Sequence, residues 1–541
     1  MGDLPRTCDS LRTLLIGIDA ACERVLDPLI DDGDVPVLAS ILETGASGPL
    51  ESQIPPWTAS AWPSLYTGMN PGKHGVFSFL SFDGYDWDVV NATDVRERTM
   101  WELLDRRGVT SVVVNAPVTH PPREFEGALI PGYTAPEDPD CHPNGILTDV
   151  REAIGEYRVY PAKEERGLIE GYVSCVRTRG EAFTYLTDRF DPEFGFLQFQ
   201  ATDSIFHERP EDEEAIRAIY REVDRQIGRV LDETDPDTVI VASDHGIGPY
   251  DGVEFRVNDF LREEGYLRTK RGGEGMPSWA TVRERNLKEG EEATHHERGA
   301  FEHAMAALAA VGVTSQRLGA VLDRLRLAEF VAERVPAAAV SAGAEQVDFP
   351  ESAAYVRSRI ELGVRINLEG REPDGVVPPG EYETVRSHLI EALGSVTTPG
   401  GNPVFETVAP REEYFHGPEH NRAVDVVTIP ADFQHFLSAT LRNEQFGPPS
   451  EPWNHKLDGI VALSGDGVDP VANLEGAHLF DVAPTVLATL GVPGDERMDG
   501  DVLPCVPSVG FRDYPRLDDD RSVETADENV ERRLADLGYL E

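Results

Sequence analysis

The chain has 541 residues, of which 40% are hydrophobic, so it is long enough for a large buried core and for more than one domain. Acidic residues outnumber basic residues by 97 to 49, which gives a net charge of −48, and only five of the basic residues are lysines. This balance argues against a surface that binds nucleic acids or anionic membranes.

The acidic residues are spread along the whole chain, which is typical of the salt-tolerant surfaces of halophilic archaeal proteins. An ordinary acidic cytosolic protein is the alternative. Five scattered cysteines argue against a disulfide framework and against a thiolate zinc site. The first twenty residues lack a basic segment followed by a long apolar one, so we expect a soluble, cytoplasmic protein, and the oligomeric state stays open.

Short apolar runs recur along the chain, and most of them end at a polar or acidic residue. Continuous runs of this kind are typical of strands buried on both faces of a parallel sheet. Helical segments separate them, for example at 95–107 and 213–231. The order predicts an α/β fold, with a sheet flanked by helices. The predicted strands are residues 14–18, 111–114, 196–199, 239–243, 426–429 and 460–463.

One region interrupts this pattern. Residues 268–300 are rich in Gly, Glu, Arg and His, and residues 301–345 read as short Ala-rich helices. We expect 268–345 to be an inserted flexible and helical cap. Residues 1–267 and 346–541 would then form the catalytic domain, and 523–541 a last amphipathic helix.

Carboxylate and imidazole side chains follow three of the predicted strands. Asp19 closes the first, Asp203 and His207 form D-x-x-x-H after the third, and Asp244 and His245 form D-H-G after the fourth. Ligands gather at the carboxyl ends of strands in such sheets. Carboxylate with imidazole suits zinc, manganese or iron better than calcium, so we predict a transition-metal site.

A hydroxyl-rich segment supplies two candidate nucleophiles, Thr58 and Ser60. A metal ion lowers the pKa of such a hydroxyl, and a helix that begins near Thr58 would direct backbone N–H groups at a phosphate. The residues alone favour a helix N-cap as the role of Thr58.

These motifs, in this order, resemble the type I phosphodiesterase/nucleotide pyrophosphatase branch of the alkaline phosphatase superfamily. The branch pattern T-F-P-N-x-x-x-x-x-T-G-x-x-P-x-x-H-G places its nucleophile on Thr58, counted back from Thr67 and Gly68. Pro71, His74 and Gly75 match the end of that segment. For the late histidine of the family, the stretch around His455 is the better match and His478 the alternative.

The resemblance implies two metal clusters, filled by Zn²⁺ or else by Mn²⁺. Asp203, His207 and His455 would hold one ion, and Asp19, Asp244 and His245 the other, with the Thr58 hydroxyl beside it. It also implies in-line attack by Thr58 on a small phosphoester and a phosphothreonine intermediate.

One position departs from the family pattern. The segment reads Thr58-Ala-Ser-Ala61, so the family's phosphate-binding Asn is missing, and we expect Ser60 or a backbone N–H to substitute. Asn115, after a strand, is a further candidate substrate contact. Alternatives to a phosphodiesterase are a phosphomonoesterase, a phosphonate hydrolase, a phosphoglycerate-mutase-like enzyme and, outside enzymes, an inactive binding protein.

Overall fold

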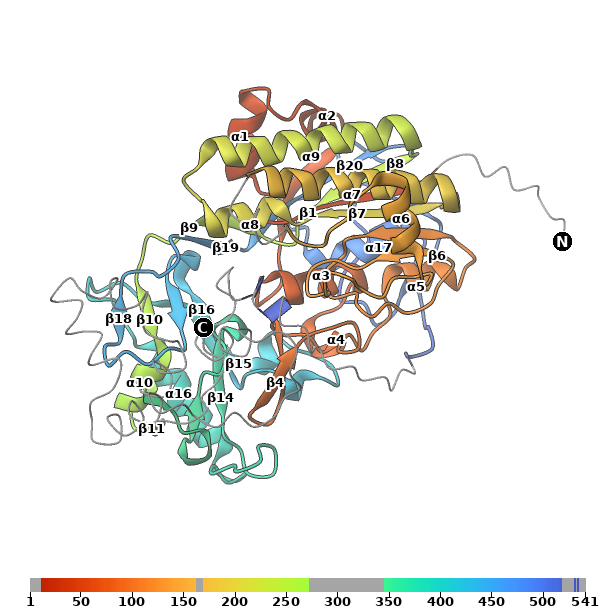
Figure 1. The fold of residues 1–541 in the computed structure, drawn as a ribbon. Coiled ribbons are helices and arrows are strands. Elements are labelled where there is room, and N and C mark those ends of the chain that lie inside the picture. Colours follow the sequence, from red (N-terminus) through yellow and green to blue (C-terminus); the bar gives the residue numbers. More distant parts are fainter. Residues whose placement is uncertain (1–10, 162–168, 272–344, 518–529, 532, 535–541) are drawn as a thin grey trace, which may run out of the picture.

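The computed structural model describes residues 11–161, 169–271, 345–517, 530–531 and 533–534. Most of the predicted insertion 268–345 and of the predicted helix 523–541 therefore lies outside the described residues. Two lobes are visible in Figure 1, a larger one built on the central sheet and a smaller one formed mainly by residues after β9. No helix among the described residues is long and apolar enough to cross a membrane.

A seven-stranded sheet forms the centre of the larger lobe, in the order β2-β20-β8-β1-β7-β5-β6. The five strands from β8 to β6 run parallel, whereas β20 and β2 are antiparallel to their neighbours. The bounds are β1 Thr13–Ile18, β2 Ala46–Glu51, β5 Ser111–Val114, β6 Gly127–Ile130, β7 Phe194–Phe199, β8 Thr238–Ala242 and β20 Asp458–Gly465.

Helices cover both faces of this sheet, because alternate residues of each buried strand point to opposite sides. Leu14 and Ile16 of β1 belong to one apolar core, and Leu15 belongs to the other. The first face packs on α1 Glu23–Asp31, α2 Pro36–Thr44, α6 Ile146–Ile154, α7 Ile169–Phe190, α8 Ala201–Glu208 and α9 Glu213–Thr234. The second packs on α3 Thr58–Thr67, α5 Met100–Asp105 and α17 Val482–Thr489.

The helix predicted at 95–107 is shorter than expected. It begins at Met100, because Thr99 and Glu102 form a reciprocal capping box there. Asp94, the expected cap, instead accepts hydrogen bonds from the backbone of Asn91 and the hydroxyl of Ser81.

The smaller lobe has sheets of its own. The run at 426–429 is a strand, but it pairs antiparallel in the four-stranded sheet β13-β14-β16-β15 and lies outside the central sheet. In the described chain as a whole, the remaining α-helices are α4 Pro71–His74, α10 Val257–Glu263 and α16 Tyr382–Gly394. The remaining strands are β3 Leu80–Asp83, β4 Asp86–Val89, β9 Gly246–Pro249, β10 Glu254–Arg256, β11 Thr269–Arg271, β12 Glu345–Val347, β13 Ala354–Tyr355, β14 Gly363–Ile366, β15 Phe405–Pro410, β16 Val426–Pro430, β17 Phe436–Ser438, β18 Phe446–Gly447, β19 Trp453–Lys456, β21 Gly494–Asp495 and β22 Phe511–Arg512.

Candidate active site

The carboxyl ends of three neighbouring strands bring the predicted acidic residues together. Asp19 directly follows β1, and β1 pairs in parallel with both β7 and β8. Asp203 lies on α8, which begins two residues after β7, and Asp244 lies two residues after β8. Because parallel strands end at the same edge of a sheet, these side chains meet there.

One group of possible metal ligands consists of Asp19, Asp244 and His245, all fully buried. The Nε2 atom of His245 lies 3.4 Å from Oδ1 of Asp19 and 3.2 Å from Oδ2 of Asp244. One ion between these atoms would contact all three residues.

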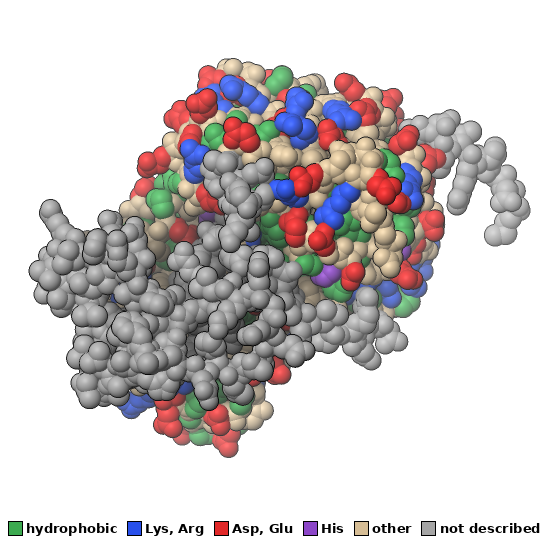
Figure 2. Space-filling view, viewed as in Figure 1, with side chains coloured by type: hydrophobic (Ala, Val, Ile, Leu, Met, Phe, Trp, Pro, Cys, Tyr) green, Lys and Arg blue, Asp and Glu red, His purple; other side chains and the backbone are tan. Residues whose placement is uncertain are grey.

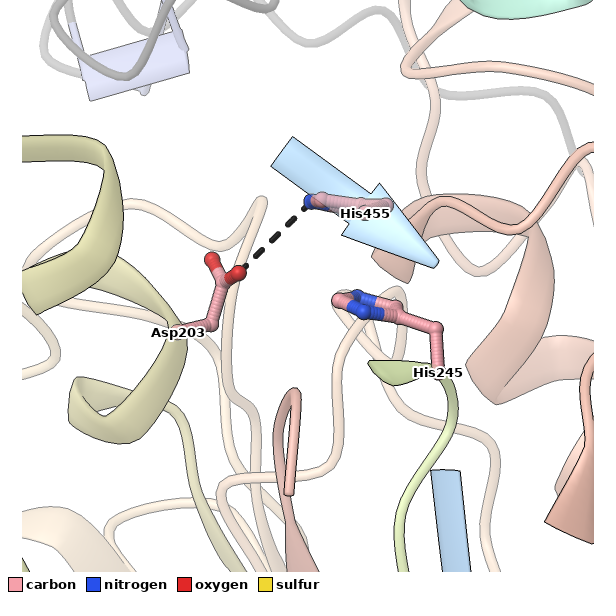
Figure 3. Close-up of side chains that lie close together, drawn as sticks. All are labelled: Asp203, His245 and His455. Atoms are coloured by element: carbon pink, nitrogen blue, oxygen red, sulfur yellow. Dashed lines mark ion pairs between the residues drawn. The ribbon is translucent and has the colours of Figure 1, made fainter. Parts of the chain in front are cut away.

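A second group surrounds Asp203. Its Oδ1 atom lies 3.2 Å from Nε2 of His207. The same atom lies 3.6 Å from Nε2 of His455, which comes from β19, and Figure 3 shows this pair beside His245. The Nε2 atoms of His207 and His455 are 3.1 Å apart. The ring of His245 stacks on that of His455 with centroids 3.7 Å apart, so the two groups adjoin.

The outer nitrogens of two of the histidines are held by backbone carbonyls. Nδ1 of His455 donates to the carbonyl of Pro56 at 2.8 Å, and Nδ1 of His245 donates to that of Gly246 at 3.0 Å. With Nδ1 as the donor, the Nε2 lone pair faces the carboxylates, which is the tautomer that binds metal. Facing lone pairs and carboxylates repel one another unless a cation lies between them, so the residues fit a metal centre.

The electrostatics of Asp19 and His455 support the same conclusion. Burial and then the charges of Asp244 and Asp203 raise the pKa of Asp19 well above its usual value. Burial and then the charge of His245 lower the pKa of His455 well below its usual value, so this ring is neutral. A divalent cation would remove the repulsion among the acids and accept the free imidazole lone pair.

Thr58 is the first residue of α3, and Trp57 occupies the N-cap position. The hydroxyl oxygen of Thr58 lies 3.5 Å from Oδ1 of Asp19 and 3.4 Å from Nε2 of His245. The hydroxyl therefore faces the first ligand group and has no capping role.

The two residues predicted to contact substrate are directed elsewhere. The hydroxyl of Ser60 donates to the carbonyl of Val76 at 2.7 Å, and the side chain of Asn115 donates to the backbone and side-chain oxygens of Gln198. Both are fully buried. In this structure the donor groups of both side chains are engaged within the protein.

His478, the alternative to His455, also has another role. Its Nδ1 atom accepts a hydrogen bond from the backbone of Phe480 and caps the turn Leu479–Asp481. The structure thus places His455 beside Asp203 in a group of possible metal ligands, and His478 in a cap.

Sequence reasoning missed two residues that hold Asp19. Gln198 and Trp62 donate to its Oδ2 atom at 2.8 and 3.0 Å. Gln198 is a polar residue inside the otherwise apolar strand β7, and this position could have indicated a role beside the site. Trp62 stands four residues after Thr58, on the same face of α3.

Solved structures with a similar fold include a phosphonoacetate hydrolase and an alkaline phosphatase. Phosphonoacetate hydrolase from Sinorhizobium meliloti 1021, solved with phosphonoformate, superposes with a TM-score of 0.52 at 17% identity, over 89% of this chain and 96% of its own. Alkaline phosphatase PafA superposes with a TM-score of 0.54 at 13% identity, over 93% of this chain and 100% of its own. These likenesses confirm the predicted fold class.

The family model for type I phosphodiesterase/nucleotide pyrophosphatase matches residues 13–342, which is more than half of the chain. The chain therefore belongs to this family, and the predicted class, a phosphoester hydrolase, is confirmed. His455 lies outside the matched residues, and its position comes from the structure. A comparison with curated protein sequences finds no match.

Proposed function

We propose that this phosphoester hydrolase cleaves phosphodiesters of small molecules, with Thr58 as its nucleophile. The observation that carries the proposal is the position of the Thr58 hydroxyl, within 3.5 Å of both Asp19 and His245 at the first turn of α3. The surrounding charge of −48 repels anionic substrates, so a phosphate site here needs local positive charge.

Two divalent cations supply that charge when bound, and they also lower the pKa of a nearby hydroxyl. Asp19, Asp244 and His245 would hold one, and Asp203, His207 and His455 the other. Carboxylate and imidazole ligands favour Zn²⁺, with Mn²⁺ as the alternative.

Residues of the chain itself carry out the remaining steps of the reaction. The Thr58 hydroxyl gives its proton to solvent and its oxygen attacks phosphorus in line with the leaving oxygen. An O–P bond forms to Thr58, the ester O–P bond breaks, and the leaving oxygen takes up a proton from water. N–H groups at the start of α3 would donate to the phosphoryl oxygens, except that of Ser60, which donates to the carbonyl of Trp57. Water then hydrolyses the phosphothreonine and restores the hydroxyl.

The substrate preference follows from Ala61. A methyl group stands where the family pattern has a phosphate-binding Asn, and Ser60 is engaged with Val76, so side-chain donors to the phosphate are fewer than in the pattern. We assign a diester because its single negative charge needs fewer donors than the double charge of a monoester. A phosphomonoesterase and a phosphonate hydrolase are the alternatives that the same assay separates.

We expect the purified protein, in molar KCl with Zn²⁺, to hydrolyse bis-p-nitrophenyl phosphate faster than p-nitrophenyl phosphate or a p-nitrophenyl phosphonate. A chelator should abolish all activity, since the buried carboxylates lose their counterions. Faster hydrolysis of the monoester would reassign the enzyme as a phosphatase, and activity that survives chelation would refute the metal centre.

Replacing Thr58 by alanine should lower kcat by about 10³-fold or more, because the nucleophile is lost while the ligands stay. Zn²⁺ content measured by mass spectrometry should stay at the wild-type value. Thr44→Ala, at an exposed threonine of α2, is the matched control and should keep full activity. Full activity in Thr58→Ala would rule out this nucleophile.

A further inference from the structure

A buried arginine near the C-terminal end of the chain contacts the helix that carries two of the ligands. Arg533 is 1% exposed, and its Nη1 atom donates to Oε1 of Glu208 at 2.8 Å. Its Nη2 atom donates to the hydroxyl of Tyr172 at 2.7 Å, and this hydroxyl donates to Oε1 of Glu208 at 2.6 Å. Arg533, Tyr172 and Glu208 thus form a closed triad that joins the chain end to α7 and α8.

Glu208 is the residue of α8 that needs this support. It ends the helix directly after His207, and a carboxylate at the C-terminal end of a helix opposes the helix dipole. α8 has eight residues, a length at which a helix is marginal without outside contacts. The guanidinium of Arg533 neutralises Glu208 and places a cation where the dipole favours one.

We propose that Arg533 is a positioning residue of the metal centre. By fixing the last turn of α8, it holds the ring of His207 at its 3.2 Å distance from Asp203 and at 3.1 Å from His455. The role rests on the proposed function, in which these three residues share one ion. A buried arginine is stable only while it is paired, so the chain end and the ligand helix stabilise each other.

The test is the Zn²⁺ affinity of the metal-free, full-length protein, measured by competition with a chromophoric chelator. Arg533→Ala should weaken the affinity about tenfold, the lower end of the effect of losing support around a ligand. Arg533→Lys, which keeps the charge, should recover part of the loss. In a Glu208→Gln background the same alanine change should have little further effect, because the two residues act as a pair.

Arg229→Ala is the matched control. This arginine pairs with Glu233 and Glu181 on the exposed side of α9 and α7, so its loss should leave the Zn²⁺ affinity unchanged. If Arg533→Ala does not fold, the Zn²⁺ affinity of Tyr172→Phe is the test in its place. This change removes one hydroxyl of the triad and should also weaken the affinity.

Three outcomes overturn the proposal. A lower melting temperature of Arg533→Ala with wild-type Zn²⁺ affinity would show a structural role only. Wild-type affinity in Tyr172→Phe, where that variant decides, would do the same. Failure of the wild-type protein to bind either Zn²⁺ or Mn²⁺ would overturn both this inference and the proposed function, whereas the other two outcomes leave the proposed function standing.

Discussion

The two carboxylate oxygens of Asp19 have separate roles. Oδ2 accepts hydrogen bonds from Gln198 and Trp62, whereas Oδ1 faces Thr58 and His245. Two donors on one oxygen fix the rotation of the carboxylate, so the other oxygen stays aimed at the proposed ion. Outer contacts of this kind orient a ligand and tune its affinity.

Replacing Gln198 by leucine should therefore weaken the site even though Gln198 touches no proposed ion. We expect about a tenfold loss of kcat/KM, because Asp19 loses one of its two fixed donors. The matched control is Gln226→Leu, a buried glutamine of α9 that donates to Glu222, and it should keep wild-type activity. Equal activity of both variants would show that Gln198 does not orient Asp19.

At the scale of single residues, the sequence predicts the meeting of the acidic side chains better than the residues that hold them in place. Asp19, Asp203 and Asp244 follow apolar runs, so their place at one sheet edge follows from strand direction alone. Gln198 meets Asp19 only because β7 and β1 pair with Gly17 opposite Gln198, a register that no local pattern specifies. The hydrogen bonds from the buried Asn115 to the same glutamine depend in the same way on the pairing of β5 with β7.

Among the elements, the smaller lobe is held by a buried charge network around Asp425. Arg371 binds both oxygens of this carboxylate at 2.7 Å, and Arg411 and the hydroxyl of Tyr382 donate to Oδ1 at 3.0 and 2.8 Å. Burial alone would raise the pKa of Asp425, but the hydrogen bonds from Arg371 and the charges of the surrounding arginines outweigh it and lower the pKa to about 2. The network joins α16 to the segments around β16.

Because of this lowered pKa, the stability that Asp425 gives to the smaller lobe depends on pH. The unfolded chain binds the proton near the ordinary value of 3.8, above the folded value of about 2. The stabilisation, about 2 kcal/mol, is therefore complete above about pH 4 and disappears as the pH falls through about 2. Asp425→Asn should lower the free energy of unfolding at pH 7 by about 3–5 kcal/mol, because it leaves buried arginines without their partner.

Denaturant unfolding of both proteins at pH 7 and at pH 2 checks this expectation. The gap between wild type and variant should be smaller at the lower pH, where the wild-type carboxyl is protonated too. A gap that is equal at both pH values would show that Asp425 is not linked to folding through its proton.

The predicted strands are strands in the structure, but which neighbour each one pairs with was predicted less well. Apolar runs identified β1, β5, β7 and β8, because strands buried on both faces need such residues. The same kind of run gave β16 and β20, and hydrophobicity alone cannot show that one belongs to another sheet and that the other runs antiparallel. β2, with alternating exposed residues, lacks that signal.

At the scale of the whole molecule, the negative charge is distributed along the chain and is not gathered in one segment. Figure 2 shows Asp and Glu side chains spread over the described part of the face drawn, with Arg and Lys among them. With a net charge of −48, self-repulsion opposes the folded state at low salt. The screening length falls from about 10 Å at 0.1 M to about 3 Å at 1 M salt, so salt should relieve the repulsion.

We therefore expect the melting temperature to rise between 0.1 and 2 M KCl, measured by scanning fluorimetry. Glycine betaine at matched osmolality, which carries no net charge and does not screen, should give a smaller rise. An equal rise in both solutes would attribute the effect to water activity, and a fall in KCl would contradict salt adaptation of this surface.

The position of β20 has a consequence for protein synthesis. This late strand lies between β2 and β8, and His455 stands just before it, so the ribosome completes Asp19, Thr58, Asp203 and Asp244 long before the sheet can close. Until β20 emerges, β8 has a bare edge and β2 lacks its partner, which exposes the nascent chain to misassembly. Under the proposed function, catalytic competence thus arrives only after His455 and β20 have been synthesised, and chains terminated before that point would need chaperones or proteolytic clearance.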